Sequence, residues 1–127
     1  MNKKGDKKMN QKKLNKILDN HKLWLSSNGM EGERANLRYA NLSSANLRYA
    51  DLSSADLDYS AFPLWCGGLN VNIDDKQAIQ LLYHLVKNVT YSKNTSAELK
   101  KLCKLKTIIK KANEFHRVDE CGIIEEG

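Results

Sequence analysis

The sequence predicts a short solenoid with helices before and after it, and three observations lead to this fold class. From Ala35 to Leu64 the chain repeats a five-residue unit six times in register. Apolar residues over 11–28 recur at the spacing of an amphipathic helix. Two further helices are expected after the repeats, because each begins with a capping-box sequence. The chain of 127 residues is short enough for one domain.

The repeat reads ANLRY, ANLSS, ANLRY, ADLSS, ADLDY and SAFPL. A period of five fits neither the 3.6-residue turn of an α-helix nor the two-residue alternation of a flat strand. It fits a coil that turns a corner after every unit, with the small first residue and the Leu or Phe at the third position pointing inward. The Asn or Asp between them, and the two corner residues, are then expected to face solvent.

This pattern resembles the pentapeptide-repeat family, whose unit is a small residue, Asp or Asn, Leu or Phe, and two polar residues. The resemblance covers residues 35–64, and the preceding segment HKLWLSSNGMEGERANL is similar to the entry segment of some members. It implies a right-handed quadrilateral β-helix over residues 30–65, with four units in each coil. The fold class expected is therefore β-solenoid plus α, with about 1.5–2 coils capped by helices.

With four units in each coil, residues that lie twenty apart would stack on one another. Arg38 would then face Asp58, and Tyr39 would face Tyr59 across adjacent coils. Arg-Tyr corners alternate with Ser-Ser corners, so Tyr49 falls on the opposite side of the coil. Arg and Tyr are common interface anchors. The candidate partner-binding residues are Arg38, Tyr39, Arg48, Tyr49, Asp58 and Tyr59.

A solenoid this short exposes open hydrogen-bonding groups and apolar side chains at both ends, so it needs caps. The helix of residues 11–28 is expected to cover the first coil with its apolar stripe. A helical cap of residues 66–127 is expected to cover the other end, as an antiparallel pair of helices over about 75–89 and 95–115. Residues 11–127 are thus expected to form a single domain.

The formal net charge of +6 is concentrated at the N-terminus. Residues 1–23 hold eight lysines and two acidic residues, whereas the other 104 residues hold equal numbers of basic and acidic side chains. Residues 1–10 carry almost no apolar side chains and are expected to form a disordered basic tail. Two interpretations fit this tail: an arm that binds phosphates, and a solubilising terminus.

Several classes of protein are excluded by what the sequence lacks. No apolar run approaches the roughly 20 residues that cross a bilayer, so no membrane association is expected. Three cysteines are an odd number, which argues against a closed disulfide framework and favours a reducing, cytoplasmic location. Gly-rich phosphate loops and GxSxG serines are missing. We therefore expect no enzyme activity, no catalytic residues and no cofactor.

Three cysteines and two histidines are candidate ligands for a metal site. Two Cys and two His would suit structural zinc, but the sequence has no close CxxC or HxxxH pair. A buried Cys or a His on an apolar stripe is also an ordinary core residue. We expect no metal, and the spacing leaves open whether four of these side chains converge. The five residues are Cys66, His84, Cys103, His116 and Cys121. The four whose convergence is left open are Cys66, His84, His116 and Cys121.

The resemblance implies a non-catalytic protein-interaction module that acts by occupying a partner. Some family members bind DNA gyrase by resembling the DNA duplex, but they are long acidic rods, whereas the coil here is short and its body neutral. The expected function is a phage or mobile-element-type inhibitor that binds and blocks a host nucleic-acid-processing or defence protein, for example of a CRISPR system. Pairing into a homodimer through open edges is also expected to be feasible, and a small ligand between the coil and the helical pair is left open.

The alternative is a nucleic-acid-binding protein that uses the basic N-terminal arm and a lysine-rich last helix. In a single helix over 95–115, three lysines would share one face, which suits a phosphate backbone or an acidic partner equally. A solvated helix face has the same sequence pattern. The residues of this alternative site are Lys3, Lys4, Lys7, Lys8, Lys12, Lys13, Lys100, Lys104 and Lys111.

Overall fold

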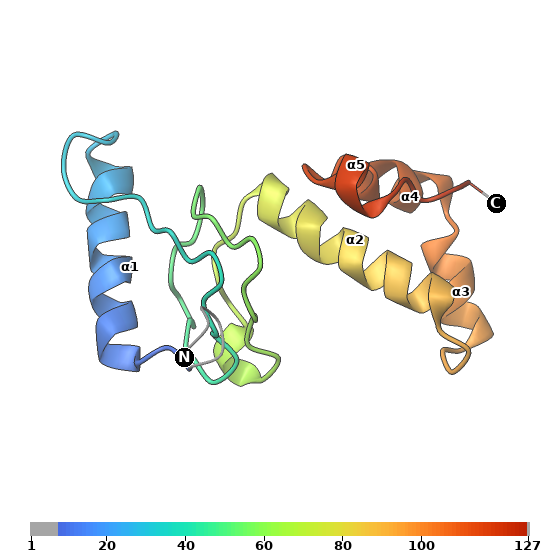
Figure 1. Cartoon of the computed structure of the whole chain (residues 1–127), viewed down its shortest axis with the longest axis horizontal. Coiled ribbons are helices and arrows are strands. Elements are labelled where there is room, and N and C mark those ends of the chain that lie inside the picture. Colours follow the sequence, from blue (N-terminus) through green and yellow to red (C-terminus); the bar gives the residue numbers. More distant parts are fainter. Residues whose placement is uncertain (1–7, 127) are drawn as a thin grey trace. The chain divides into compact units, whose positions relative to one another are not determined.

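The computed structural model describes residues 8–126, and their regular secondary structure is helical (Figure 1). The chain divides between Asp74 and Asp75 into two compact units, and α1 and the repeats belong to the first. The predicted single domain and the covering of the coil by the C-terminal helices concern the placement of one unit on the other, and they stay predictions. The helical elements are α1 (Gln11–Ser26), the 3-10 helix η1 (Cys66–Gly68), α2 (Asp75–Tyr91), α3 (Ala97–Cys103), α4 (Lys106–Ala112) and α5 (Val118–Cys121).

The predicted quadrilateral β-helix is wrong, because the repeats form no β-strand. Over residues 8–126, parallel pairing of extended backbone is limited to isolated bridges. The cause lies in the repeat itself, since a corner after every few extended residues ends each pairing before a ladder can form. The bridges join Lys8 to Asn41, Asn36 to Asp56, Asn41 to Ala61 and Asp51 to Asn72.

The repeats instead form a coil whose turns contact one another at a spacing of about twenty residues. The backbone N–H of Leu37 donates to Asp56 O at 2.9 Å, and that of Leu42 donates to Ala61 O at 2.8 Å. After residue 62 the register changes, because Asp51 pairs with Asn72 and not with the residue twenty positions on. The twenty-residue register expected from the sequence is therefore present up to the loop that contains η1.

Each corner from residue 36 to residue 58 is closed by the side chain at the second position of its repeat. There, an Asn or Asp Oδ1 accepts a hydrogen bond from the backbone N–H two residues further on, at N···O distances of 2.9–3.1 Å. This local bond holds the turn and explains why Asn or Asp occupies the position. The repeat pattern alone predicts only that these side chains face solvent. They are Asn36, Asn41, Asn46, Asp51 and Asp56.

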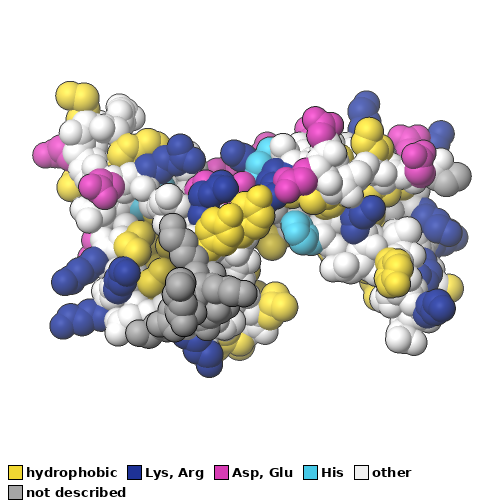
Figure 2. Space-filling view, in the orientation of Figure 1, with side chains coloured by type: hydrophobic (Ala, Val, Ile, Leu, Met, Phe, Trp, Pro, Cys, Tyr) yellow, Lys and Arg dark blue, Asp and Glu magenta, His cyan; other side chains and the backbone are white. Residues whose placement is uncertain are grey.

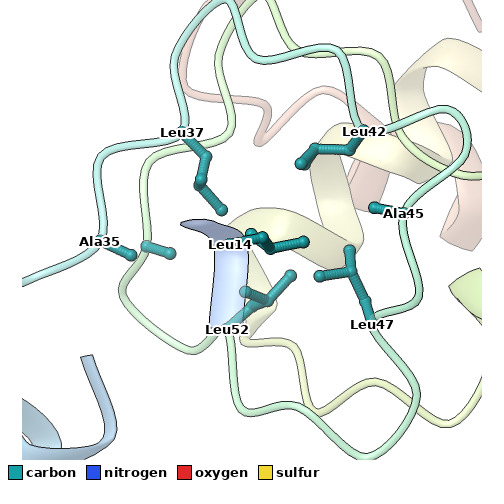
Figure 3. Close-up of a cluster of buried hydrophobic side chains, with 8 residues drawn as sticks. Leu14, Ala35, Leu37, Leu42, Ala45, Leu47 and Leu52 are labelled. Carbon is teal, nitrogen blue, oxygen red and sulfur yellow. The ribbon is translucent and has the colours of Figure 1, made fainter. Parts of the chain in front are cut away.

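The core of the first unit lies inside the coil, where the first and third residues of the repeats meet (Figure 3). This confirms the predicted inward positions. Helix α1 contributes Leu14 to the same cluster, and so covers one end of the coil as predicted. The buried residues are Leu14, Ala35, Leu37, Leu42, Ala45, Leu47, Leu52 and Ala55.

His21 ties α1 to the coil through both ring nitrogens. The ring is fully buried, with Nε2 2.8 Å from Ser53 O and Nδ1 2.9 Å from the backbone nitrogen of Ala35. A backbone N–H can only donate, so Nδ1 accepts and Nε2 carries the proton that is donated to Ser53 O.

The residues just before α1 also bond to the coil, because Met9 N–H donates to Asn41 O at 2.9 Å. Residues 8–10 are therefore part of this unit, and the rest of the predicted tail, residues 1–7, lies outside the described residues.

The second unit packs α2 against α3 and α4. The helix expected over 75–89 is confirmed and continues to Tyr91, but the single helix expected over 95–115 is wrong. The helix is interrupted between Cys103 and Lys106. On one continuous helix, Cys103 and Ile109 would lie about 120° apart. The break allows both side chains to enter one core. That core contains Tyr83, Val86, Val89, Cys103, Ile109, Ala112, Phe115 and Ile124.

The last described residues are held to this unit by side-chain hydrogen bonds. Tyr83 Oη donates to Gly122 O at 2.5 Å. The Asn113 amide donates to Ile124 O at 2.9 Å and accepts from Ile124 N–H at 2.8 Å. These bonds position the buried Ile124 side chain. Among the described residues, no helix combines the length and the apolar character that crossing a bilayer would require.

Candidate interaction surface

Two corners of the coil have the same sequence but different surroundings. The unit ANLRY occurs at residues 35–39 and again at 45–49. In both copies the final Tyr has a left-handed backbone, with φ of 63° at Tyr39 and 65° at Tyr49. Their exposed fractions nevertheless differ twofold, at 39% for Tyr39 and 77% for Tyr49. The difference therefore comes from the part of the chain that lies against each corner.

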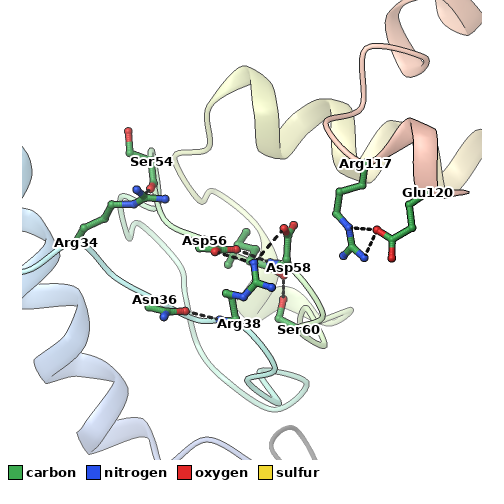
Figure 4. Close-up of polar contacts among 10 residues, drawn as sticks. Arg34, Asn36, Arg38, Ser54, Asp56, Asp58, Ser60, Arg117 and Glu120 are labelled. Atoms are coloured by element: carbon green, nitrogen blue, oxygen red, sulfur yellow. Dashed lines mark hydrogen bonds and ion pairs between the residues drawn. The ribbon is translucent and has the colours of Figure 1, made fainter.

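The first corner is completed by charges and a ring from the next turn of the coil. Tyr39 stacks on Tyr59, with ring centroids 4.7 Å apart and planes 3° from parallel. Arg38 pairs with Asp56 at 3.2 Å and with Asp58 at 3.5 Å, as Figure 4 shows. Both contacts predicted from the twenty-residue spacing, Arg38 with Asp58 and Tyr39 with Tyr59, are confirmed.

The electrostatics of this corner follow from the same contacts. The hydrogen bond that Arg38 donates to Asp56 raises the pKa of the guanidinium above its usual value, and the negative charges of Asp56 and Asp58 act in the same direction. The guanidinium carbon also lies 5.3 Å from the ring centroid of Tyr59, within cation–π range. The polar and aromatic groups of the first corner thus satisfy one another within the chain.

The second corner has no such complement. Tyr49 N–H donates to Asn70 O at 2.8 Å, where Tyr39 N–H donates to Asp58 O. Leu47 N–H likewise donates to Gly67 O, where the equivalent bond at the first corner reaches Asp56 O. Arg48 contacts its own neighbour, with its guanidinium carbon 5.4 Å from the Tyr49 ring centroid and Nη2 3.3 Å from Tyr49 Oη. Within residues 8–126, Arg48 forms no ion pair.

An exposed apolar loop lies next to this second corner. Leu64, Trp65 and Leu69 are exposed to 97%, 48% and 59%. Trp65 Nε1 donates to Ala45 O at 3.1 Å, which fixes the indole beside the first residue of the second ANLRY unit. Gly67 allows the close approach, because a Cβ there would lie 2.3 Å from the Trp65 ring and 2.7 Å from Ala45 O.

Comparison with known proteins decides the family. A family model described as pentapeptide repeats (8 copies) matches residues 33–62. Residues 33–62 are therefore pentapeptide repeats. Searches of the curated proteins and of the solved structures find no match to the chain. Pentapeptide repeats are, in general terms, protein-interaction modules, and the family is generally non-catalytic.

The basic residues predicted for nucleic-acid binding are spread over both units of the pentapeptide-repeat protein. Lys3, Lys4 and Lys7 lie outside the described residues. Lys8 is exposed and bridges to Asn41. Figure 2 shows Lys and Arg side chains over α1. A shallow hollow of about 430 Å³ at the start of this helix is lined by Asn10, Lys12, Lys13 and Lys16.

The three lysines predicted to share a face in the second unit have separate environments, because their helix is broken. Lys100 Nζ donates to Val89 O at 2.8 Å and also to Ser92 O, so it closes the C-terminal end of α2. Lys104 caps α3 and is exposed. Lys111 pairs with Glu114 at 3.1 Å. The predicted common face of Lys100, Lys104 and Lys111 is therefore wrong, and their role in binding nucleic acid stays a prediction.

The candidate metal ligands are divided between the two units, with Cys66 in the first and the others in the second. No group of three or more His, Cys, Asp or Glu side chains among residues 8–126 has the geometry to hold a metal. Cys66 and Cys121 are exposed free thiols, and Cys103 is buried in the core of the second unit. His84 Nδ1 lies 2.7 Å from Gln80 O on its own helix.

Proposed function

We propose that this pentapeptide-repeat protein binds and blocks a host nucleic-acid-processing or defence protein, such as a CRISPR component, as phage and mobile-element inhibitors do. The observation that carries the proposal is the second Arg-Tyr corner, which presents Arg48 and Tyr49 in the repeat whose first residue, Ala45, accepts a hydrogen bond from the half-exposed Trp65. Arg, Tyr and Trp are the side chains that contribute most at protein interfaces. The assignment to an inhibitor rests on analogy with family members that occupy nucleic-acid enzymes.

The coil suits a function that depends on shape, because its corners are rigid. Every corner from residue 36 to residue 58 is held by a hydrogen bond from a side chain to the backbone N–H two residues further on. Backbone hydrogen bonds to a neighbouring turn add to it. A preorganised surface loses little conformational entropy on binding. The corner residues can therefore serve as fixed anchors for a partner.

Affinity capture of the tagged protein from its host, with and without nuclease treatment, tests the proposal. We expect a protein partner to be recovered in both samples, and we expect the purified partner to lose activity when the pentapeptide-repeat protein is added. The matched control is the Arg48→Gln variant, which retains the coil but lacks the free cation. Recovery of nucleic acid alone, or a partner that is lost after nuclease treatment, would contradict the proposal.

A second candidate function, nucleic-acid binding, is favoured by the lysine-lined hollow at the start of α1. Its three lysines would release counterions on binding phosphates, so the affinity for duplex DNA should fall with a log–log salt slope of about −0.9 for each phosphate contact. Replacing Lys12, Lys13 and Lys16 with Gln should remove most of that slope. An unchanged slope in the triple variant would rule out this hollow as a nucleic-acid site.

A further inference from the structure

We propose that the corner formed by Arg48 and Tyr49, called here the open corner, binds an acidic segment of a partner protein that carries an aromatic residue next to a carboxylate. The inference rests on the proposed function and names the surface and the chemistry through which the partner is held. It follows from comparing two copies of one pentapeptide within a single chain.

The first corner shows which groups complete an ANLRY unit. Two carboxylates, from Asp56 and Asp58, lie 3.2 and 3.5 Å from the Arg38 guanidinium. A tyrosine ring from the same segment stacks on Tyr39 at 4.7 Å. The complement is thus the sequence Asp-Leu-Asp-Tyr, which supplies charge and ring together from one corner of the next turn.

The open corner lacks every part of this complement. The residues whose carbonyls accept the equivalent backbone bonds are Gly67 and Asn70, which carry neither a charge nor a ring. The register change after residue 62 brings them there in place of another acidic repeat. Tyr49 consequently keeps an exposed fraction of 77%, and the Arg48 guanidinium forms its hydrogen bond and its cation–π contact with Tyr49.

The surroundings of the open corner favour a protein segment over the other possible occupants. Nucleic acid is bound through several cations that neutralise successive phosphates, whereas the loop against this corner presents Trp65 and Leu69. A second copy of the chain is disfavoured, because its Asp56, Asp58 and Tyr59 are already engaged with Arg38 and Tyr39. An acidic, aromatic segment of another protein matches both the Arg48 guanidinium, which has no ion pair among the described residues, and the apolar surface.

The probe for this surface is the acetylated and amidated peptide Asp-Leu-Asp-Tyr, titrated into the full chain and followed by NMR. We expect saturable shifts of the Arg48 Nε–H signal and of the Tyr49 ring signals. Arg48→Gln should weaken the binding about fivefold, the upper range for an exposed ion pair. The peptide Asn-Leu-Asn-Tyr should bind to the unaltered protein more weakly to a similar extent, because it keeps the ring and lacks the charges.

Arg38→Gln is the matched control, since it alters the same position of the same pentapeptide. Arg38→Gln should lower the melting temperature and leave peptide binding at the open corner unchanged. Arg48→Gln should weaken peptide binding and leave the melting temperature unchanged. The inference is overturned if the peptide gives no saturable shift at Arg48, if the Asn peptide binds as well, or if a single-stranded oligonucleotide shifts the same signals at lower concentration. A captured protein partner that binds Arg48→Gln unchanged would overturn the inference and leave the proposed function standing.

Discussion

The rings of Tyr39 and Tyr59 lie almost parallel at 4.7 Å, and this stack joins two turns of the coil that are twenty residues apart in sequence. Tyr39→Ala should therefore destabilise the first unit. Tyr49→Ala is the matched control, because it removes a ring from the same pentapeptide and the same left-handed backbone but breaks no stack. We expect Tyr39→Ala to cost about 1 kcal/mol more than Tyr49→Ala.

Urea unfolding followed by tryptophan fluorescence measures this difference cleanly. The chain has two tryptophans, Trp24 and Trp65, and both belong to the first unit. The fluorescence transition therefore reports on the unit that contains the coil and α1. Equal midpoints for the two variants would show that the Tyr39–Tyr59 stack contributes no stability.

His21 is expected to be the most sensitive polar residue of the first unit. His21→Leu keeps an apolar side chain of similar size but leaves the Ala35 N–H and the Ser53 carbonyl without their partners in a buried position. Each unsatisfied buried group costs about 1–3 kcal/mol, so the unfolding free energy should fall by about 2–4 kcal/mol. His84→Leu, at an exposed position of the second unit, should leave the tryptophan transition unchanged. A loss below about 0.5 kcal/mol for His21→Leu would show that water replaces both bonds.

The inward residues and the corner stacks could be predicted because the repeat sets a register, and a register determines which residues meet. The role of the second position was missed, although the signal was present: Asn or Asp occupies it in five successive units, and both residues bond readily to the backbone two residues on. The sides of the coil are too short to form strands, so the β-helix implied by the resemblance does not form. The five-residue periodicity does not reveal this.

The features that were not predictable lie where the repeat ends. Asn41 pairs with a residue twenty positions on, whereas Asp51 pairs with one twenty-one positions on, so the register changes between residues 62 and 72. The different surroundings of Arg38 and Arg48 therefore cannot be predicted from two identical pentapeptides. In the second unit, Leu99, Leu102 and Leu105 have the spacing of an apolar helix stripe, yet each of them is about half exposed. Burial of Cys103 and Ile109 in one core determines the break between α3 and α4, and only tertiary packing shows it.

Asp51 should make the first unit sensitive to acid. Burial opposes ionisation of this carboxyl, but the hydrogen bonds from the Ser53 hydroxyl and N–H outweigh it, with a hydrogen bond from Asn72 adding to them, and the pKa is lowered. A carboxyl whose pKa is depressed by folding stabilises the protein fully above its unfolded pKa, about 3.9 for Asp, and this stabilisation is lost as the pH falls through the folded pKa.

Asp51→Asn provides the test, because Asn41 makes the same pair of bonds with Ser43 and shows that the amide fits this corner. Between pH 5 and pH 3, the urea midpoint of the unaltered protein should fall more than that of Asp51→Asn. The tryptophan transition at the two pH values measures both midpoints. Equal losses in the two proteins would mean that Asp51 titrates alike in the folded and unfolded chains.

Lys100 is expected to act mainly through the stability of the second unit. Its ammonium bonds to Val89 O and Ser92 O at the C-terminal end of α2, where a positive charge also interacts favourably with the helix dipole. Lys100→Met keeps the aliphatic stem and removes these bonds, so we expect a loss of about 1–2 kcal/mol. Amide hydrogen exchange of the buried Val86 and Val89 measures this loss within the second unit.

Lys104→Met is the matched control, because this lysine is exposed and follows the end of α3. It should leave the exchange of Val86 and Val89 unchanged. Because Lys100 is engaged with backbone carbonyls, any affinity of the second unit for nucleic acid should depend more on Lys104 than on Lys100. A folded Lys100→Met protein with unchanged exchange rates and weakened DNA binding would reverse this assignment, since it would show that the ammonium leaves the end of α2 to contact phosphate.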